Sequence, residues 1–204
     1  MIHLDVPQGT LEWFKARMGK PTASEFDKIL TPGTLKLSKQ SHGYLCRLVA
    51  EHVLQEPFQT ETNVWAMDRG IELEQEAVEF YELTTGYATT PAGLCLTDDE
   101  RIGASPDRFS GADGLLEIKC PLAHTHVGYL LAGELPVEYL LQIYGQLYVT
   151  GKQWVDFLSY FPGLPAVLLR IAPDPKIQDA LHSALTLFLD QLTEAKRRLE
   201  EMRQ

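Results

Sequence analysis

The sequence predicts an α/β fold in which helices surround a small mixed sheet. Three observations favour it: a strand–turn–strand pattern over residues 105–121, two later apolar runs of strand length, and helical periodicity before and after these strands. At 204 residues the chain is long enough for one well-buried domain and short for two. No linker divides it, so we expect a single domain over residues 1–204.

The composition is that of a soluble globular protein, with 45% hydrophobic residues and mixed charge. No apolar run reaches the ~18 residues of a membrane span, and the N-terminus lacks a signal-peptide pattern. The cysteines, Cys46, Cys95 and Cys120, form no C-x-x-C motif, which fits a reducing compartment and gives no zinc spacing. We therefore expect a cytoplasmic protein without a membrane attachment.

The net charge of −10 is unlike that of most nucleic-acid binders, but it is unevenly distributed. Residues 1–50 hold seven Lys or Arg and four Asp or Glu, whereas residues 51–100 hold one Arg and twelve acids. A protein that grips DNA locally while staying soluble fits this pattern, and so does one that never meets DNA. Charge alone does not decide between them.

The first helical elements place a cation near a helix start. Residues 10–18 read as a short amphipathic helix closed by Gly19, and Thr22 to Glu25 has capping-box spacing before a second helix. Ser24 then lies in a first turn, where free N–H groups favour an anion, and Arg17 is close enough to add a bidentate cation. Simple capping beside a surface arginine fits the same spacing.

A loop over 31–43 follows, with Lys36 and Lys39, and then a helix over about 40–55. Basic loops of this kind often follow a phosphate backbone, although a solvated connector is an equally good interpretation.

The predicted helix over 62–86 carries one acid in its apolar stripe. Glu74 shares a face with Ile71, Ala77, Val78 and Tyr81, whereas the side chains of Glu72, Glu76 and Glu79 point to the opposite side. A carboxylate in such a position needs a partner or a raised pKa. A metal ion or an arginine from elsewhere would each satisfy it.

The strand–turn–strand pattern places two carboxylates together. With the loop centred on Ala112, Asp107 pairs with Glu117, and Glu117 and Lys119 project from the same strand face, about 6.6 Å apart. Hard divalent ions such as Mg²⁺ bind such oxygen ligands, and an adjacent lysine can stabilise charge on a phosphoryl oxygen. The alternative is a surface hairpin with an ordinary Glu–Lys pair.

Residues 89–104 should supply a further strand, with Gly103 permitting close packing beside the site. Ser105, two residues before Asp107, shares its strand face. The pair His124 and His126 lacks further ligands at zinc spacing, so we interpret it as surface or capping histidines.

The C-terminal part predicts a helix, two strands and a long final helix. In the helix over 136–150, Leu140, Tyr144 and Leu147 mark the buried side, which leaves Gln142 exposed together with Gly145, Gln146 and Val149. Strands over 153–161 and 166–171 follow. The helix over 174–204 should pack along the body of the domain, with a subunit contact as the alternative.

The ordered set of motifs resembles the phage lambda exonuclease family, the YqaJ-like viral recombinases, within the PD-(D/E)xK nuclease superfamily. The matching residues run from Trp13 to Tyr160 and comprise Trp13, Arg17, Thr22-Ala23-Ser24, Gly70-x-x-x-Glu74, Tyr81-Glu82, Ser105-Pro106-Asp107, Glu117-x-Lys119, Cys120-Pro121 and a Tyr-x-x-Gln142 helix. The resemblance implies a restriction-endonuclease-like PD-(D/E)xK core: a small mixed central sheet flanked by helices.

The resemblance also implies roles for single residues. Asp107, Glu117 and the Ile118 carbonyl would bind Mg²⁺, with Glu74 at a second ion; two ions are expected, and Mn²⁺ is an alternative. Glu72 competes with Glu74 for this assignment.

Lys119 and Gln142 would act at the scissile phosphate, and Gln142 is also expected near the terminal phosphate. The residues implied to hold a 5′-phosphate are Arg17, Ser24, Ser105 and Gln142. Arg108 departs from the family, where the residue after the aspartate is often smaller, and joins Lys36 and Lys39 as a candidate DNA contact.

The implied function is a metal-dependent 5′-to-3′ exonuclease on double-stranded DNA that prefers 5′-phosphorylated ends and leaves 3′ overhangs for recombination by strand annealing. Relatives form ring-shaped homotrimers and work with a single-strand annealing protein, and the family implies a phage or prophage origin. The rival predictions are a structure-specific endonuclease or a repair exonuclease on the same core, and a non-catalytic DNA-binding scaffold.

Overall fold

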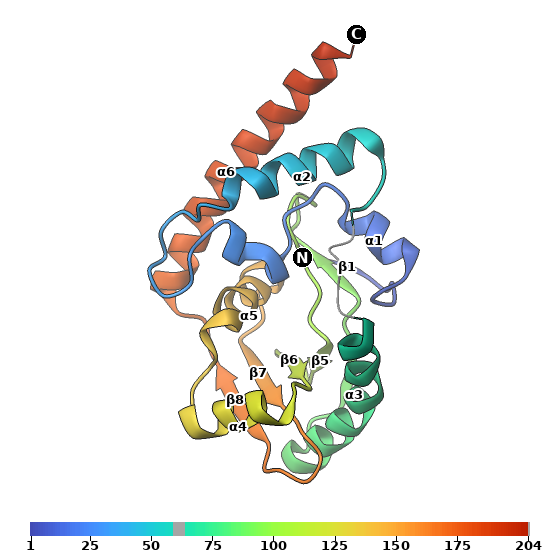
Figure 1. Cartoon of the computed structure of the whole chain (residues 1–204), viewed down its shortest axis with the longest axis vertical. Coiled ribbons are helices and arrows are strands. Elements are labelled where there is room, and N and C mark those ends of the chain that lie inside the picture. The colour runs from blue at the N-terminus through green and yellow to red at the C-terminus, as the bar shows by residue number, and fades with distance from the viewer. Residues whose placement is uncertain (59–63, 204) are drawn as a thin grey trace.

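The computed structural model describes residues 1–58 and 64–203; within 64–72 it describes the backbone only. Helices and strands alternate irregularly along the chain (Figure 1). The helices are α1 (Leu11–Arg17), the 3₁₀ helix η1 (Ala23–Lys28), α2 (Ser41–Leu54), α3 (Val64–Thr85), α4 (Ala123–Ala132), α5 (Val137–Thr150) and α6 (Pro175–Met202). The strands are β1 (Ile2–Leu4), β2 (Thr89–Pro91), β3 (Leu94–Leu96), β4 (Gly103–Ala104), β5 (Arg108–Ser110), β6 (Gly114–Lys119), β7 (Trp154–Ser159) and β8 (Val167–Ile171).

The central sheet is mixed, as predicted. Its strand order is β2-β5-β6-β7-β8, with β6 and β7 parallel and the other neighbours antiparallel. A parallel pair needs a long crossover, which α4 and α5 supply between β6 and β7 (Figure 1).

Helices cover both faces of this sheet because β6 is apolar on both sides. Leu115 packs with Ile143 of α5 and Phe157 of β7, whereas Leu116 packs with Tyr81 of α3 and Leu158 of β7. The face assignment predicted for residues 115–119 is therefore confirmed. This two-sided burial holds the end of β6 rigidly between α3 and α5.

The prediction of one further strand over 89–104 is wrong in the number of strands. The segment forms three short strands, of which β2 joins the central sheet while β3 and β4 form a second sheet with β1 in the order β1-β3-β4. The division falls at Gly93, whose φ is +54° and whose missing Cβ would lie 2.5 Å from the Leu4 carbonyl oxygen. The chain changes sheets where only glycine permits that approach.

Helix α5 is buried on more sides than predicted. Gly145, Gln146 and Val149 are buried rather than exposed: Gly145 and Val149 pack with Phe26 of η1, and Gln146 lies against Glu117 of β6. A Cβ at Gly145 would lie 2.6 Å from the Phe26 ring of η1. A helical wheel finds one apolar stripe, whereas α5 lies between the sheet, η1 and α6.

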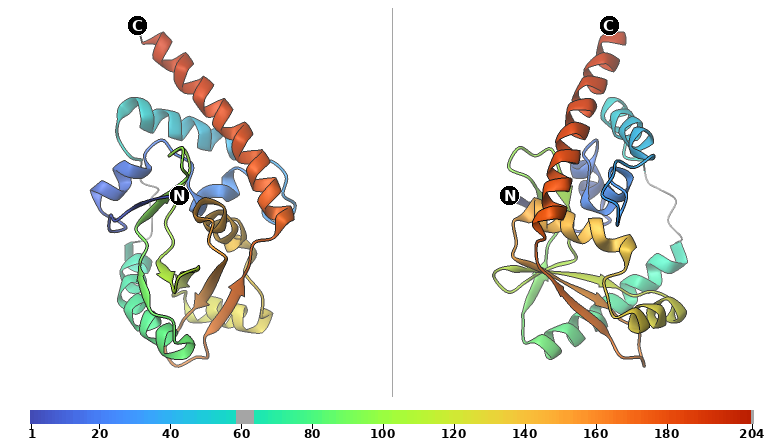
Figure 2. Two further views of the ribbon diagram at one scale, coloured as in Figure 1. Left: turned by 180° about the vertical axis from the view of Figure 1, so that it is seen from behind. Right: turned by 90° about the vertical axis from the view of Figure 1, so that its left-hand side faces the viewer.

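Helix α6 packs on α2 and then projects beyond the body of the molecule (Figure 2). The predicted stripe is confirmed at Leu181, Leu185, Phe188 and Leu192, and Phe188 stacks on Tyr44 of α2. Over the described residues, no helix has the length and apolar character needed to cross a bilayer.

Candidate active site

The hairpin formed by β5 and β6 has the predicted register. Arg108 pairs with Leu116 and Phe109 with Leu115, so Asp107, one residue before β5, lies opposite Glu117. The Asp107 carboxylate accepts a hydrogen bond of 2.6 Å from the Ile118 backbone N–H across the hairpin. Two acids thus reach one end of the sheet from neighbouring segments.

Glu117 is the most constrained acid of the site. Its side chain is only 1% exposed, and its carboxylate accepts three hydrogen bonds. Lys119 Nζ and Gln142 Nε2 donate to Oε1 at 2.6 and 2.5 Å, and Gln146 Nε2 donates to Oε2 at 2.6 Å. The structure therefore brings together Glu117 and Lys119, as the strand pattern predicts, with Gln142, which only the family resemblance placed at the site, and adds Gln146.

The charged groups at the hairpin, Asp107, Glu117 and Lys119, affect one another's protonation. Burial raises the pKa of Asp107 well above its usual range, and the neighbouring Glu117 charge raises it further. Burial disfavours the Lys119 ammonium, but the charges of Glu117 and Asp107 outweigh that cost and raise the pKa of Lys119. Lys119 is therefore a cation at physiological pH, which suits charge stabilisation better than proton abstraction.

Glu74 lies half-buried on α3 and within electrostatic reach of the hairpin. Burial raises its pKa, the Arg108 charge lowers it, Glu117 raises it and Lys119 lowers it. The buried residues Ala77 and Val78 confirm that this face of α3 packs against β6. The competing residue Glu72 has a side chain outside the described part of the chain.

The donor set fits a hard divalent cation in its chemistry. It offers carboxylate oxygens, a surplus of negative charge, and burial that makes the Asp107 carboxylate unfavourable without a counter-ion. Among the described residues, no three His, Cys, Asp or Glu side chains form a ready ligand cluster. Glu117 Oε1 already accepts two hydrogen bonds, whereas Oε2 accepts one and keeps a lone pair for a metal ion.

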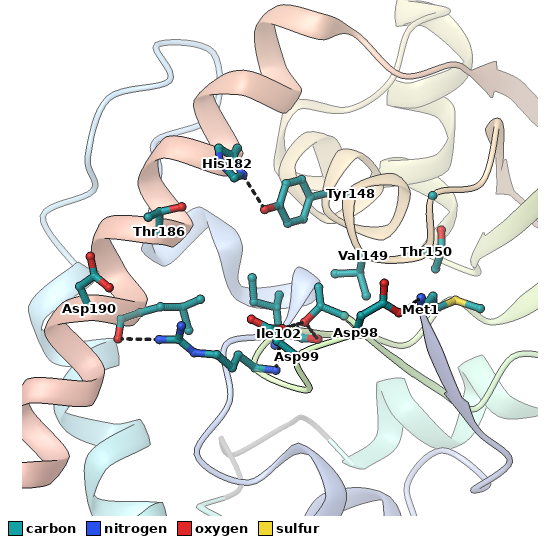
Figure 3. Close-up of a pocket in the computed structure, with 14 residues that line it drawn as sticks. Met1, Asp98, Asp99, Ile102, Tyr148, Val149, Thr150, His182, Thr186 and Asp190 are labelled. Carbon is teal, nitrogen blue, oxygen red and sulfur yellow. Dashed lines mark hydrogen bonds and ion pairs between the residues drawn. The ribbon is translucent and has the colours of Figure 1, made fainter.

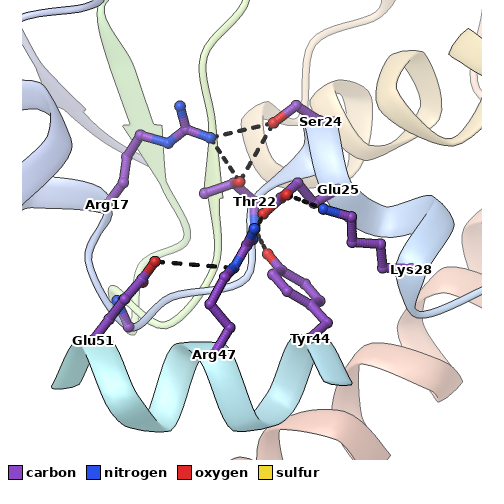
Figure 4. A network of polar contacts seen from close by, with 9 residues as sticks. Arg17, Thr22, Ser24, Glu25, Lys28, Tyr44, Arg47 and Glu51 are labelled. Atoms are coloured by element: carbon purple, nitrogen blue, oxygen red, sulfur yellow. Dashed lines mark hydrogen bonds and ion pairs between the residues drawn. The ribbon is translucent and has the colours of Figure 1, made fainter. Parts of the chain in front are cut away.

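A second polar cluster surrounds Arg17 at the end of α1 (Figure 4). Its guanidinium donates to the hydroxyls of Thr22 at 2.8 Å and Ser24 at 3.2 Å, and lies 3.8 Å from the centre of the Trp13 ring. Trp13 Nε1 in turn donates to Ser105 Oγ at 2.9 Å. Of the four residues predicted for phosphate binding, Arg17, Ser24 and Ser105 are thus joined through Trp13, whereas Gln142 contacts Glu117 instead.

The Arg17 cation is not neutralised by the acids around it. Burial lowers its pKa to about 10, so it stays protonated at neutral pH. In the described part of the chain no carboxylate lies within 4.0 Å of Arg17, whereas the nearby Arg47 is paired with Glu25 and Glu51 (Figure 4). A part-buried, unpaired guanidinium ringed by hydroxyls is suited to an anionic ligand.

The predicted capping box at Thr22 does not form. The Thr22 hydroxyl accepts from Arg17 instead of capping η1, and Glu25 contacts Lys28 and Arg47. The Thr22 backbone N–H donates to the Tyr44 hydroxyl of α2 at 3.1 Å. Tertiary partners have replaced the local cap.

Of the remaining candidates, Arg108 lies close enough to Glu74 for its charge to lower the Glu74 pKa, whereas the two lysines lie on a loop. Lys36 and Lys39 are exposed on the loop before α2. Arg108 is fixed to Thr89, donating to its hydroxyl at 2.6 Å and to its carbonyl, on the α3 side of the sheet. Gly103 packs against Thr22, as its predicted close contact requires.

Two polar residues were misplaced by the sequence pattern. Gln146 was expected at the surface and is buried against Glu117; the only signal was its spacing of four residues from Gln142. His126 was expected at the surface and is fully buried, bonded to Ser159 Oγ at 2.7 Å and to the Pro165 carbonyl at 2.8 Å.

A pocket of about 550 Å³ lies away from both clusters, between the β3–β4 turn, the end of α5 and α6 (Figure 3). None of the predicted site residues lines it. Asp98, Asp99 and Asp190 do, and their charge disfavours a phosphate backbone there.

A mixed sheet that presents Asp107 opposite a Glu-x-Lys strand end, with helices on both faces, is the core of the PD-(D/E)xK nucleases. The chain belongs to the YqaJ-like viral recombinase family, the lambda exonuclease family: the profile of the YqaJ-like viral recombinase domain matches residues 12–153.

Solved structures agree with this assignment. The alkaline exonuclease LHK-Exo from Laribacter hongkongensis, one of whose structures contains dAMP, is 34% identical over 95% of this chain and 98% of that one, with a TM-score of 0.84. A phage-related exonuclease from Haemophilus somnus 129PT shares the fold at 15% identity, over 90% of this chain and 96% of that one, with a TM-score of 0.63. No curated protein sequence matches the chain.

Proposed function

We propose that this protein is a metal-dependent exonuclease that degrades one strand of duplex DNA from a 5′-phosphorylated end and leaves 3′ overhangs. The observation that carries the proposal is the pairing of the part-buried Asp107 with the buried Glu117 on one hairpin, with the Lys119 ammonium bonded to Glu117. Family membership supports nuclease activity on DNA.

The metal ligands in this proposal are Asp107, Glu117 and the Ile118 carbonyl, with Glu74 for a second ion. Mg²⁺ is the expected ion, and Mn²⁺ should substitute. When bound, such ions supply an activated water and stabilise the leaving oxygen. Glu117 is held in place for this role by side chains from α5 and by its own strand neighbour.

Lys119 would stabilise the negative charge that grows on the phosphate as the bond breaks. Its raised pKa keeps it protonated, and its side chain lies beside the Glu117 carboxylate. Gln142 donates to the same Glu117 oxygen and would lie next to the scissile phosphate.

End recognition would come from the cluster around Arg17. Arg17, Ser24 and Ser105 would bind the terminal 5′-phosphate, with Gln142 between this pocket and the cleavage site. A phosphate pocket beyond the scissile bond selects ends, because a continuous strand cannot fill it. The dAMP in the LHK-Exo complex supports a nucleotide site in this fold. Lys36, Lys39 and Arg108 remain candidate contacts to the duplex.

The proposal includes the assembly known for relatives. A homotrimeric ring would enclose the duplex, and a single-strand annealing protein would take over the exposed strand. As a phage or prophage protein, the chain would act in the bacterial cytoplasm.

Digestion of three substrates tests the proposal: a 5′-phosphorylated linear duplex, the same duplex with 5′-hydroxyl ends, and a closed circle. We expect Mg²⁺-dependent loss of the first, slower loss of the second, none of the third, and no reaction with chelator. Rapid cutting of the circle would favour a structure-specific endonuclease. DNA left intact by the wild-type chain after long incubation with Mg²⁺ would favour a non-catalytic scaffold.

A further inference from the structure

Gln146 contacts the candidate active site although no sequence motif points to it. It lies on α5, one helical turn after Gln142, and is 1% exposed. Its Nε2 donates to Glu117 Oε2 at 2.6 Å, and its Oε1 has no hydrogen-bond partner among the described residues. Among the described residues, the hydrogen bond that this side-chain amide makes therefore goes to Glu117.

The three donors to Glu117 do not duplicate one another. Lys119 and Gln142 both donate to Oε1, whereas Gln146 is the donor to Oε2. Contacts to one oxygen leave the carboxylate free to rotate about its Cγ–Cδ bond, but contacts to both oxygens fix its plane. Rotating the amide by 180° would place Gln146 Oε1 against a carboxylate oxygen, so the observed orientation is the only one that bonds.

The backbone that carries Gln146 is held firmly. Thr150 Oγ1 donates to the Gln146 carbonyl at 2.7 Å, and the preceding Gly145 packs directly on Phe26. An apolar side chain of similar length would fill this position and remove the unpaired Gln146 Oε1, but it would leave Glu117 Oε2 without its donor. A glutamine is therefore better explained by its contact to Glu117 than by packing.

We infer that Gln146 is a positioning residue that fixes the plane of the Glu117 carboxylate and so sets its geometry toward the divalent cation. The inference rests on the proposed function and deepens it. Partners that orient a metal-binding carboxylate typically change metal affinity or activity by about 10- to 100-fold when they are removed.

The test compares Gln146→Met with the control Gln178→Met. Gln178 also donates to α5, at the Tyr144 carbonyl, but does not contact Glu117. Mg²⁺ and Mn²⁺ binding is measured by calorimetry on the full chain without DNA, and duplex hydrolysis is measured as kcat and as the KM for DNA. We expect Gln146→Met to weaken metal binding and lower kcat, each about 10- to 100-fold, with the KM for DNA close to wild type and a native fold by circular dichroism.

Gln146→Asn is the second variant, because it keeps the amide but is too short to reach Glu117; it should lose metal affinity to the same extent and serves if Gln146→Met does not fold. A folded Gln146 variant with wild-type metal affinity and kcat overturns the inference while leaving the proposed function intact. Equal losses in the Gln178 control would also overturn it. A wild-type chain that neither binds Mg²⁺ nor cleaves DNA removes the proposed function and this inference together.

Discussion

Asp107 is a carboxyl group whose burial and neighbouring Glu117 charge both favour its protonated form. When an acid has a higher pKa in the folded than in the unfolded chain, its contribution to stability is complete below the unfolded pKa, ~3.9 for Asp, and is lost as the pH rises through the folded pKa. Without metal, the charged Asp107 should therefore destabilise the fold at neutral pH.

We expect Asp107→Asn to abolish DNA cleavage and yet raise the melting temperature in chelator by a few °C, since ~1 kcal/mol corresponds to about 2–4 °C in a chain of this size. The gain should vanish on acidification. Scanning calorimetry across a pH series, with the exposed Asp179→Asn as control, checks this. A variant that follows the wild-type curve at every pH contradicts the raised pKa.

Lys119 is held as a cation by the two carboxylates beside it. Lys119→Ala should lower kcat by at least ~10²–10³-fold, because a charge aimed at the transition state is lost, while circular dichroism shows a native fold. The matched control is Lys152→Ala, in the loop between α5 and β7, whose ammonium donates to the Ala112 carbonyl at the tip of the same hairpin. Similar rates for both variants would exclude Lys119 from the chemistry.

Arg17 holds an unpaired charge between hydroxyls. Arg17→Ala should chiefly remove the preference for phosphorylated ends, reducing the rate ratio of 5′-phosphate to 5′-hydroxyl duplex toward one, because the anion-binding cation is gone. Exposed Lys15→Ala, on the same helix, should keep the wild-type ratio. If Arg17→Ala discriminates the two ends as wild type does, the phosphate is bound elsewhere.

At the scale of elements, the register of the β5–β6 hairpin could be predicted from the sequence, but the burial of α5 could not. The register of the β5–β6 hairpin followed from its turn residues, which placed Asp107 opposite Glu117 correctly. The burial of Gly145 and Gln146 did not follow, because it depends on contacts with distant parts of the chain: Gly145 with Phe26 of η1 and Gln146 with Glu117 of β6. The separation of β2 from β3 at Gly93 likewise depends on a contact to Leu4.

Packing of α5 on η1 is tested by Gly145→Ala. The new Cβ would lie 2.6 Å from the Phe26 ring, so the two elements must separate, and we expect a loss of about 1–3 kcal/mol in the free energy of unfolding. The control Gly128→Ala in α4 has no atom within 4 Å of the new Cβ and should be neutral or stabilising by up to ~1 kcal/mol. Urea titration measures both. Equal changes in the free energy of unfolding for the two variants would show that the Phe26 side chain moves aside without a measurable cost.

At the scale of the whole molecule, the fold class and the helix covering of both sheet faces were predictable, because β6, β7 and the helices that cover them have strong local patterns. The second sheet was not, since β1 and β4 are only three and two residues long and have little pattern of their own. The Arg17 cluster required the resemblance, because local spacing fitted a capping box equally well.

The oligomeric state also concerns the molecule as a whole. The proposed ring trimer predicts a solution mass three times that of the 22.9 kDa chain, unchanged on dilution through the micromolar range. Light scattering coupled to size-exclusion chromatography measures it. A mass equal to one chain at every concentration would contradict the ring.

The position of α5 has a consequence for the products. One helix carries Gln142 and Gln146 against Glu117, and the same helix packs through Gly145 on η1, the element that contains Ser24. If Arg17 and Ser24 bind the terminal phosphate, the spacing from that phosphate to the cutting centre is set by the protein interior and not by the substrate. The length of each released fragment is then constant from the first cut to the last, whatever the base sequence.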